Sequence, residues 1–206
     1  MTSRRVFAIG FVAMLAAMKA DAGNRAGDCV TIYIKHAFLV DSYVLRIAEH
    51  TAGSIFDDIG VSVEWKHFAS QPVGDACVAI HVEFDSELPS KYHSGALAYA
   101  LPYAAGGTQI HVDANRVQRR PALNQSGAML GCVLAHEIGH VLERVNRHSR
   151  QGIMKAAYTN DDLPGILRHS LRFANEDVDL IHKGLASRVT MASGVRARPP
   201  GATFEY

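Results

Sequence analysis

The sequence predicts an α+β fold, in which one mixed sheet is packed against helices. Short stretches that are rich in β-branched residues, or that alternate apolar with polar residues, predict strands. Three longer stretches with apolar residues at helical spacing predict helices. Their order, β-α-β-β-β-β-α-loop-α, fits a single sheet with helices against it. The chain has 206 residues, of which 48% are hydrophobic and 20% charged, so one globular domain is expected rather than a disordered or fibrous protein.

The first half of the domain alternates between strand and helix patterns. Residues 30–38 are rich in β-branched and aromatic side chains and predict a strand. Residues 41–58 place apolar side chains at helical spacing, and Gly60 ends this helix. Residues 61–68 and 78–84 alternate apolar and polar side chains, which is typical of half-buried strands.

Two further strands precede the second helix. Residues 95–101 form a weaker strand pattern that Pro102 ends, and residues 108–112 form the next one. Residues 126–143 are strongly apolar on one side and predict the second helix. A long loop is expected after it.

The last helix is expected to begin at Asn175, which can cap it, and to end near Leu185. Beyond that point the chain has no apolar period, so residues 188–206 are expected to form a flexible tail. The folded domain is therefore predicted to span residues 23–187.

Residues 1–22 have the pattern of a secretory signal peptide. Arg4 and Arg5 precede an apolar run, residues 6–18, and a small-residue cleavage site follows at Ala22. The run is too short to cross a bilayer. A buried N-terminal helix is the alternative, which the polar residues that close the run disfavour. We therefore expect a secreted or periplasmic protein with no membrane attachment after cleavage.

The overall charge gives no reason to expect a nucleic-acid partner, because 21 basic side chains stand against 20 acidic ones. A monomer is expected. The first strand begins near Val30, shortly after the inferred mature start at Gly23, so no N-terminal inhibitory segment is expected.

Three cysteines remain in the mature chain. Cys29 and Cys77 each open a predicted strand and form the expected disulfide, which export makes possible. Cys132 lies inside the second helix and is expected to be a buried small apolar residue. An odd number of cysteines leaves at least one thiol free or paired between chains.

His136, Glu137 and His140 form an HExxH motif on the second predicted helix. Residues four apart lie on one face of a helix, so both imidazoles can reach one metal ion. Glu137 lies alongside and can take a proton from a water molecule on that metal. The helix is apolar around much of its circumference, and ionisable residues on such a helix need a partner such as a divalent cation.

Catalytic zinc sites use three protein ligands, so a third ligand is needed. His148 is the leading candidate, but it can reach the metal only if the helix ends between residues 143 and 146. Asn146 and a downstream carboxylate remain alternatives. Glu176 is the candidate carboxylate, although an acidic residue in the first turn of a helix also serves as a cap.

The stretch HEIGHVLERVNRHSRQGIM resembles the active-site segment of the metzincins, in particular the matrix-metalloproteinase form. It is still more similar to small secreted bacterial proteins of metzincin type that carry HExxH, seven residues, HS, and then G-[IL]-M. This resemblance implies a metzincin-like catalytic domain with a mixed five-stranded sheet, an active-site helix and a C-terminal helix. It also implies one catalytic Zn²⁺ ion and assigns the residues of the site: His136, His140 and His148 as ligands, Glu137 as general base, and Met154 as the turn methionine beneath the metal.

The resemblance further implies that a peptide or protein substrate pairs with the fourth strand. By count that strand is residues 95–101, so Gly95, Ala96, Leu97 and Ala98 are predicted to bind substrate. Tyr158 is a candidate for stabilising an oxyanion, although surface packing is the alternative for it.

The segment also departs from the metzincin pattern. Where the family has glycine at the end of the active-site helix this chain has Glu143, where the bacterial relatives tend to have it this chain has Arg144, and Asn146 stands at the usual third-ligand position. With no glycine at the turn, the helix either overruns or ends in a strained conformer, or Asn146 adopts the left-handed conformation, which asparagine tolerates.

These observations together predict a secreted zinc-dependent peptidase. Two alternatives remain: a gluzincin-type peptidase with Glu176 as the third ligand, and a secreted zinc-binding protein without turnover, which the departures at Glu143 and Arg144 leave open.

Overall fold

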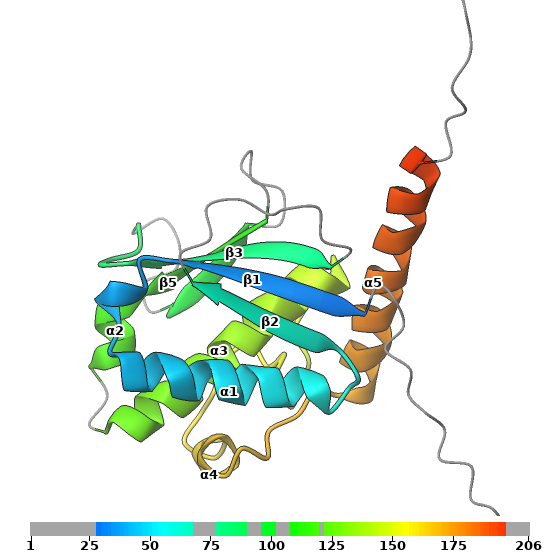
Figure 1. Ribbon diagram of the computed structural model, residues 1–206. Helices are drawn as coiled ribbons and strands as arrows, with labels where there is room; N and C mark the ends of the chain where they lie inside the picture. Colours follow the sequence, from blue (N-terminus) through cyan, green and yellow to red (C-terminus); the bar gives the residue numbers. More distant parts are fainter. Residues whose placement is uncertain (1–27, 68–76, 90–95, 102–107, 120–121, 197–206) are drawn as a thin grey trace, which may run out of the picture.

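The computed structural model describes residues 28–67, 77–89, 96–101, 108–119 and 122–196 (Figure 1). It is a mixed α+β structure with a mixed five-stranded sheet, as expected, and the strand order is β2-β1-β3-β5-β4. β2, β1, β3 and β5 run parallel to one another, and β4 is antiparallel to β5 at one edge. The strands are β1 (Cys29–Lys35), β2 (Ser62–His67), β3 (Val78–Asp85), β4 (Ala98–Leu101) and β5 (Gln109–Asp113).

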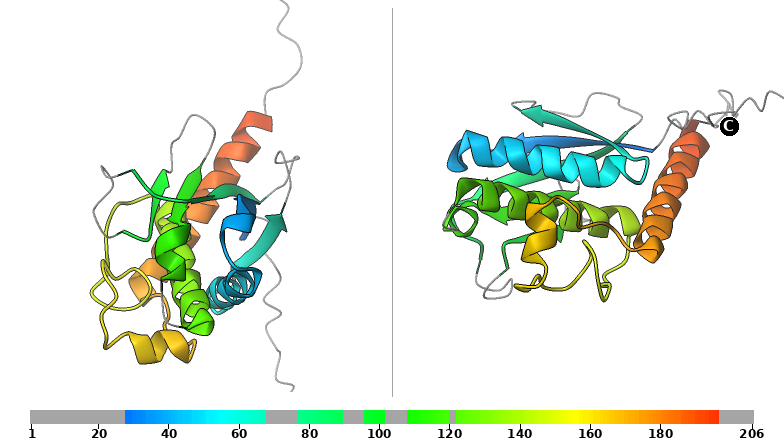
Figure 2. Two further views of the ribbon diagram at one scale, coloured as in Figure 1. Left: turned by 90° about the vertical axis from the view of Figure 1, so that its left-hand side faces the viewer. Right: turned by 90° about the horizontal axis from the view of Figure 1, so that it is seen from below.

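The helices lie mainly on one face of this sheet. α1 and α3 run side by side across that face, and α5 crosses at one end (Figure 2). The helices are η1 (Ala37–Leu39, 3₁₀), α1 (Ser42–Asp57), α2 (Ala114–Gln118), α3 (Leu123–Glu143), α4 (Leu163–Leu167) and α5 (Asn175–Arg196).

Two glycines let α3 lie very close to α1. A Cβ at Gly127 would lie 2.6 Å from Ile47 Cβ, and a Cβ at Gly131 would lie 2.5 Å from Thr51 Cβ. α3 therefore packs closely against α1 on the same face of the sheet, and its apolar residues are buried. These are Ala128, Met129, Leu130, Cys132, Val133, Leu134, Ala135, Ile138, Val141 and Leu142.

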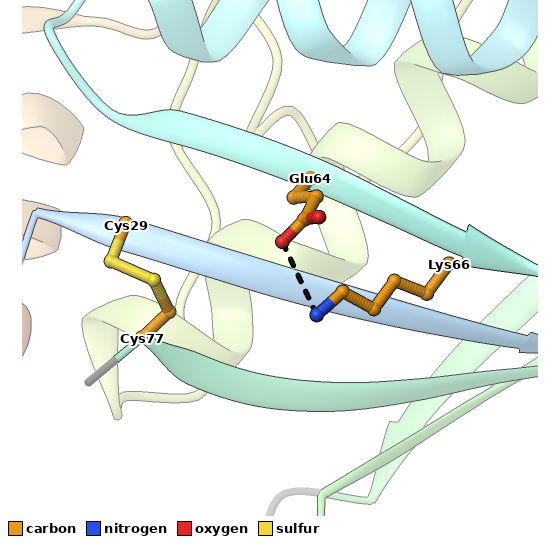
Figure 3. The surroundings of a disulfide bond; sticks show 4 residues. All are labelled: Cys29, Glu64, Lys66 and Cys77. Atoms are coloured by element: carbon orange, nitrogen blue, oxygen red, sulfur yellow. Dashed lines mark ion pairs between the residues drawn. A yellow bond between two sulfur atoms is a disulfide. The ribbon is translucent and has the colours of Figure 1, made fainter. Parts of the chain in front are cut away.

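A disulfide joins Cys29 at the start of β1 to Cys77, directly before β3, with a Cα–Cα distance of 4.8 Å (Figure 3). It links the ends of two adjacent parallel strands, as expected. Glu64 and Lys66 of the neighbouring β2 form an ion pair at 3.4 Å (Figure 3). Cys132 is a free thiol and is buried.

Several elements differ from the sequence-based expectation. The first strand ends at Lys35, because His36 adopts a left-handed conformation with φ 55° and a 3₁₀ turn follows. α3 begins at Leu123, and α5 continues to Arg196. The prediction that the tail starts at residue 188 is therefore wrong for residues 188–196, which are helical.

Other predicted features lie outside the described residues. These are the signal peptide at residues 1–22, Gly95, and the remaining tail at residues 197–206. Within the described part of the chain, no helix combines the length and apolar character that crossing a membrane requires.

Candidate metal centre

α3 carries the first two candidate ligands. Its helical spacing brings His136 Nε2 within 3.0 Å of His140 Nε2, with both side chains partly buried. Both imidazoles leave the same face of a helix that is otherwise embedded in the core, as the HExxH spacing predicts.

The end of α3 makes the third ligand possible. The helix ends at Glu143, and Arg144 adopts the left-handed conformation with φ 60° and ψ 21°. The Arg144 N–H donates to the His140 carbonyl at 3.2 Å. Of the alternatives for this turn, the structure has a helix that ends in a strained conformer, at Arg144 and not at Asn146.

α5 supports this turn from the other side. Gly184 lies so close to α3 that an added Cβ would be 1.8 Å from the Leu142 carbonyl oxygen. Arg188 donates to the Val141 carbonyl at 2.8 Å, and Arg144 donates to Ser187 Oγ at 3.2 Å. Side chains of α5 thus satisfy a carbonyl at the C-terminus of α3 that the helix itself leaves without a partner.

The turn returns His148 to the first two histidines. His148 Nε2 lies 3.3 Å from His140 Nε2, and the three candidate ligand atoms all lie within 4.8 Å of one another. Zinc with Zn–N distances of about 2.0–2.1 Å in tetrahedral geometry separates its nitrogen ligands by about 3.3 Å. The spacing of His136, His140 and His148 therefore fits one zinc ion.

The protonation of His136 also suits a metal ligand. Its Nδ1 lies 2.8 Å from the Ile153 carbonyl oxygen, which can only accept, so Nδ1 carries the proton and Nε2 presents a lone pair. Burial lowers the pKa of His136. Burial, followed by the neighbouring His136 and His148, lowers the pKa of His140 to about 4. Both imidazoles are thus neutral at pH 7, as metal ligation requires.

Glu137 is buried on the same helix next to the histidines. Burial raises the pKa of its carboxyl to about 7, while a hydrogen bond from the Ala100 backbone N–H acts in the opposite direction. Its carboxylate therefore faces β4, the edge strand of the sheet. A carboxyl with this pKa can both accept and release a proton near neutral pH.

Met154 lies fully buried against α3 at the predicted turn. An added Cβ at Gly139 would lie 2.6 Å from Met154 Sδ, so the thioether fits against the helix because residue 139 has no side chain. The turn is joined to the preceding loop, since the Ser149 N–H donates to the Met154 carbonyl at 2.7 Å.

The free edge of β4 differs from the predicted substrate strand. The Leu97 carbonyl accepts from the Asp113 N–H at 2.9 Å, so that carbonyl is committed to the sheet. The register pairs Ala98 with Val112 and Ala100 with Ile110, and the backbone groups of Ala98 and Ala100 therefore point away from β5. Ala96 precedes the strand. Ala100, which the sequence did not single out, belongs to the free edge in place of Leu97.

Tyr158 and Glu176 both make contacts with groups other than the metal-ligand atoms. The Tyr158 hydroxyl donates to the Ile153 carbonyl at 2.8 Å and lies 3.3 Å from the Cys132 carbonyl, and burial raises its pKa. Its hydroxyl is therefore engaged by the backbone of this turn. Glu176 has a side chain that is 76% exposed and lies 3.6 Å from Arg147 Nη1, apart from the three histidines.

The sequence also did not predict a cluster of charged side chains next to His148, in which two carboxylates are buried. Glu143 and Asp177 have fully buried side chains, and the Arg147 guanidinium lies between them at 3.8 Å and 2.6 Å. Their positions at the ends of two separate helices gave no local pattern by which to find them.

The sequence matches no protein-family model and no curated protein. Among solved structures, the chain is similar to the crystal structure of archaemetzincin from Methanopyrus kandleri, with 16% sequence identity and a TM-score of 0.46. The match covers 79% of this chain and 97% of that chain.

Proposed function

We propose that this protein is a zinc-dependent peptidase of metzincin type that hydrolyses peptide bonds. The observation that carries the proposal is the convergence of three imidazole nitrogens, from His136, His140 and His148, beside the buried carboxyl of Glu137. One Zn²⁺ ion held by these nitrogens would supply Lewis acidity toward the scissile carbonyl and lower the pKa of a bound water molecule.

The side chains of the protein account for the proton transfers. Glu137 Oε, with the carboxyl pKa near 7, accepts a proton from the attacking water and then donates it to the nitrogen of the leaving amine. Its hydrogen bond from the Ala100 N–H keeps the carboxylate oriented along the edge of β4. This hydrogen bond favours the charged form, so Glu137 remains a competent base despite its burial.

The substrate is proposed to be an extended peptide that adds to the free edge of β4. The outward-facing groups available for this pairing are those of Ala98 and the Ala100 carbonyl, since Glu137 occupies the Ala100 N–H. The strand lies beside α3, so a peptide paired there would pass the three histidines.

Two alternatives are less well supported. A gluzincin arrangement requires Glu176 at the metal, but its side chain is exposed and pairs with Arg147. A zinc-binding protein without turnover would have a site closed by a fourth protein ligand. Among the described residues the candidate ligand group contains three histidines, and Glu137 stands beside it as a fourth, non-ligating group.

The proposal includes export to the periplasm or the extracellular medium. It relies on the signal-like residues 1–22 and is compatible with the Cys29–Cys77 disulfide, because disulfides persist mainly in oxidising compartments. We further propose a monomer whose partners are peptides or proteins and not nucleic acids.

The decisive experiment combines metal analysis with a peptide-library cleavage assay on the wild type, Glu137→Gln and His136→Ala. Glu137→Gln should retain zinc and lose at least about 100-fold in hydrolysis, because only proton transfer is removed. His136→Ala should lose both zinc and hydrolysis. Glu64→Gln, an exposed change on β2, serves as the control. Wild-type turnover by Glu137→Gln would show that the assigned base is wrong.

A further inference from the structure

The position of His148 is not set by a helix or a strand. It lies between the left-handed turn at Arg144 and the short bridge that pairs Ser149 with Lys155, and its side chain is exposed. The other two histidines are fixed by α3. The geometry of the three-histidine group therefore depends on what holds this loop in place.

The two neighbours of His148 are held by one buried carboxylate. Asp177 Oδ1 accepts from Arg147 Nη2 at 2.6 Å and from Ser149 Oγ at 2.5 Å. Asp177 is fully buried and belongs to the first turn of α5. One oxygen atom on α5 thus binds the residue before His148 and the residue after it.

Asp177 is itself held rigidly. Its second oxygen, Oδ2, accepts from the Ala174 backbone N–H at 3.0 Å, which caps the start of α5. A negative charge in the first turn of a helix is also favoured by the helix dipole. Arg147 Nη1 donates to Ser149 Oγ at 3.2 Å, so Arg147, Ser149 and Asp177 form a closed ring of hydrogen bonds.

We propose that Asp177 is a positioning residue, which holds His148 in metal-binding geometry by clamping Arg147 and Ser149. This inference rests on the proposed metal centre. Without such a clamp, an exposed imidazole on a loop would be free to turn into solvent. Hydrogen bonds behind metal ligands commonly change metal affinity by 10–100-fold when they are lost.

The test removes one arm of the clamp without changing any charge. Ser149→Ala deletes the hydroxyl, Ser149→Thr restores it, and Ser170→Ala is a control that deletes an exposed serine hydroxyl bonded to the Gly165 carbonyl. For each variant, Zn²⁺ affinity is measured by competition with a chromophoric chelator. The unfolding midpoint and the amide exchange of residues 145–150 are measured on the metal-free protein.

Ser149→Ala is expected to weaken Zn²⁺ binding by 10–100-fold and to speed amide exchange in residues 145–150. Ser149→Thr and Ser170→Ala are expected to bind zinc like the wild type. If Ser149→Ala binds zinc as tightly as the wild type, or no more weakly than Ser170→Ala, the clamp is overturned and the metal centre still stands. If the wild type binds no zinc, the proposed function is overturned. In that case the clamp is tested by amide exchange alone, and unchanged exchange of residues 145–150 in Ser149→Ala would overturn it.

Discussion

His136 and Tyr158 share one hydrogen-bond acceptor, the backbone carbonyl of Ile153. His136 Nδ1 and the Tyr158 hydroxyl each lie 2.8 Å from that oxygen. The carbonyl belongs to the turn that also contains Met154, so a single backbone group joins the methionine turn to the first candidate ligand. Tyr158 thereby acts on the site through the backbone.

This relationship predicts the effect of Tyr158→Phe. Removing the hydroxyl leaves the His136 hydrogen bond in place, so peptide hydrolysis should fall by less than about 10-fold, whereas loss of direct transition-state stabilisation costs about 100-fold or more. The free energy of unfolding should fall by about 1 kcal/mol, as for one lost buried hydrogen bond. Kinetics and chemical denaturation measure the two effects. A large loss of turnover with an unchanged free energy of unfolding would show that the Tyr158 hydroxyl stabilises the oxyanion directly.

The left-handed turn at Arg144 predicts that two small substitutions at this residue differ in their free energy of unfolding. Arg144→Gly and Arg144→Ala both remove the contact with Ser187 and differ only in the Cβ atom. Since φ is 60° at this residue, the glycine variant should be more stable than the alanine variant by about 1 kcal/mol. Urea unfolding of metal-free protein measures the difference. Equal stabilities would show that the turn relaxes in solution.

Glu143 predicts a pH dependence of stability. Burial, followed by Asp177, raises the pKa of its carboxyl to about 7, although Arg147 acts in the opposite direction and Glu176 adds to the increase. A folded-state pKa above the unfolded value means that the native state binds more protons. The contribution of Glu143 is therefore most favourable below about pH 4.5 and is lost as the pH rises through 7.

Glu143→Gln should remove this contribution and make the free energy of unfolding less dependent on pH between about 4.5 and 7. About 1.4 kcal/mol per unit of pKa difference is the upper bound of the effect. Denaturation of the metal-free wild type and variant at several pH values measures it. The histidines, whose lowered pKa values give stability that is lost toward acid, are common to both proteins and cancel in the comparison. Parallel pH profiles would contradict the assignment to Glu143.

The parts of the site predicted correctly from the sequence follow local rules. The HExxH spacing places two imidazoles on one helix face, and the alternating or β-branched stretches became β1, β2, β3 and β5. The resemblance to the metzincin segment suggested His148, which lies with His136 and His140 as expected. The helix and strand features depend on spacing within a single element, whereas His148 was assigned through the resemblance of a longer segment.

The parts that could not be predicted depend on contacts between distant segments. The sequence left open whether the helix overran, ended in a strained conformer or turned at Asn146, and the turn lies at Arg144, whose side chain contacts Ser187 of α5. Asp177 binds residues 30 and 28 positions away in sequence. α5 extends to Arg196 without the apolar period that would have indicated it.

The close approach of α5 to α3 predicts that one substitution has opposite effects at two helical glycines. At Gly184 an added Cβ would lie 1.8 Å from the backbone oxygen of Leu142, and backbone cannot move aside as a side chain can. Gly184→Ala should therefore destabilise the protein by at least about 3 kcal/mol and weaken Zn²⁺ binding, because α5 carries Asp177. At Gly165 the nearest atom is 3.8 Å away, so Gly165→Ala should be neutral or stabilising by about 0.5 kcal/mol, as alanine is favoured in helices. Denaturant unfolding of both variants measures the two changes in the free energy of unfolding. If Gly184→Ala is as stable as Gly165→Ala, α5 does not pack against the end of α3 in the way described.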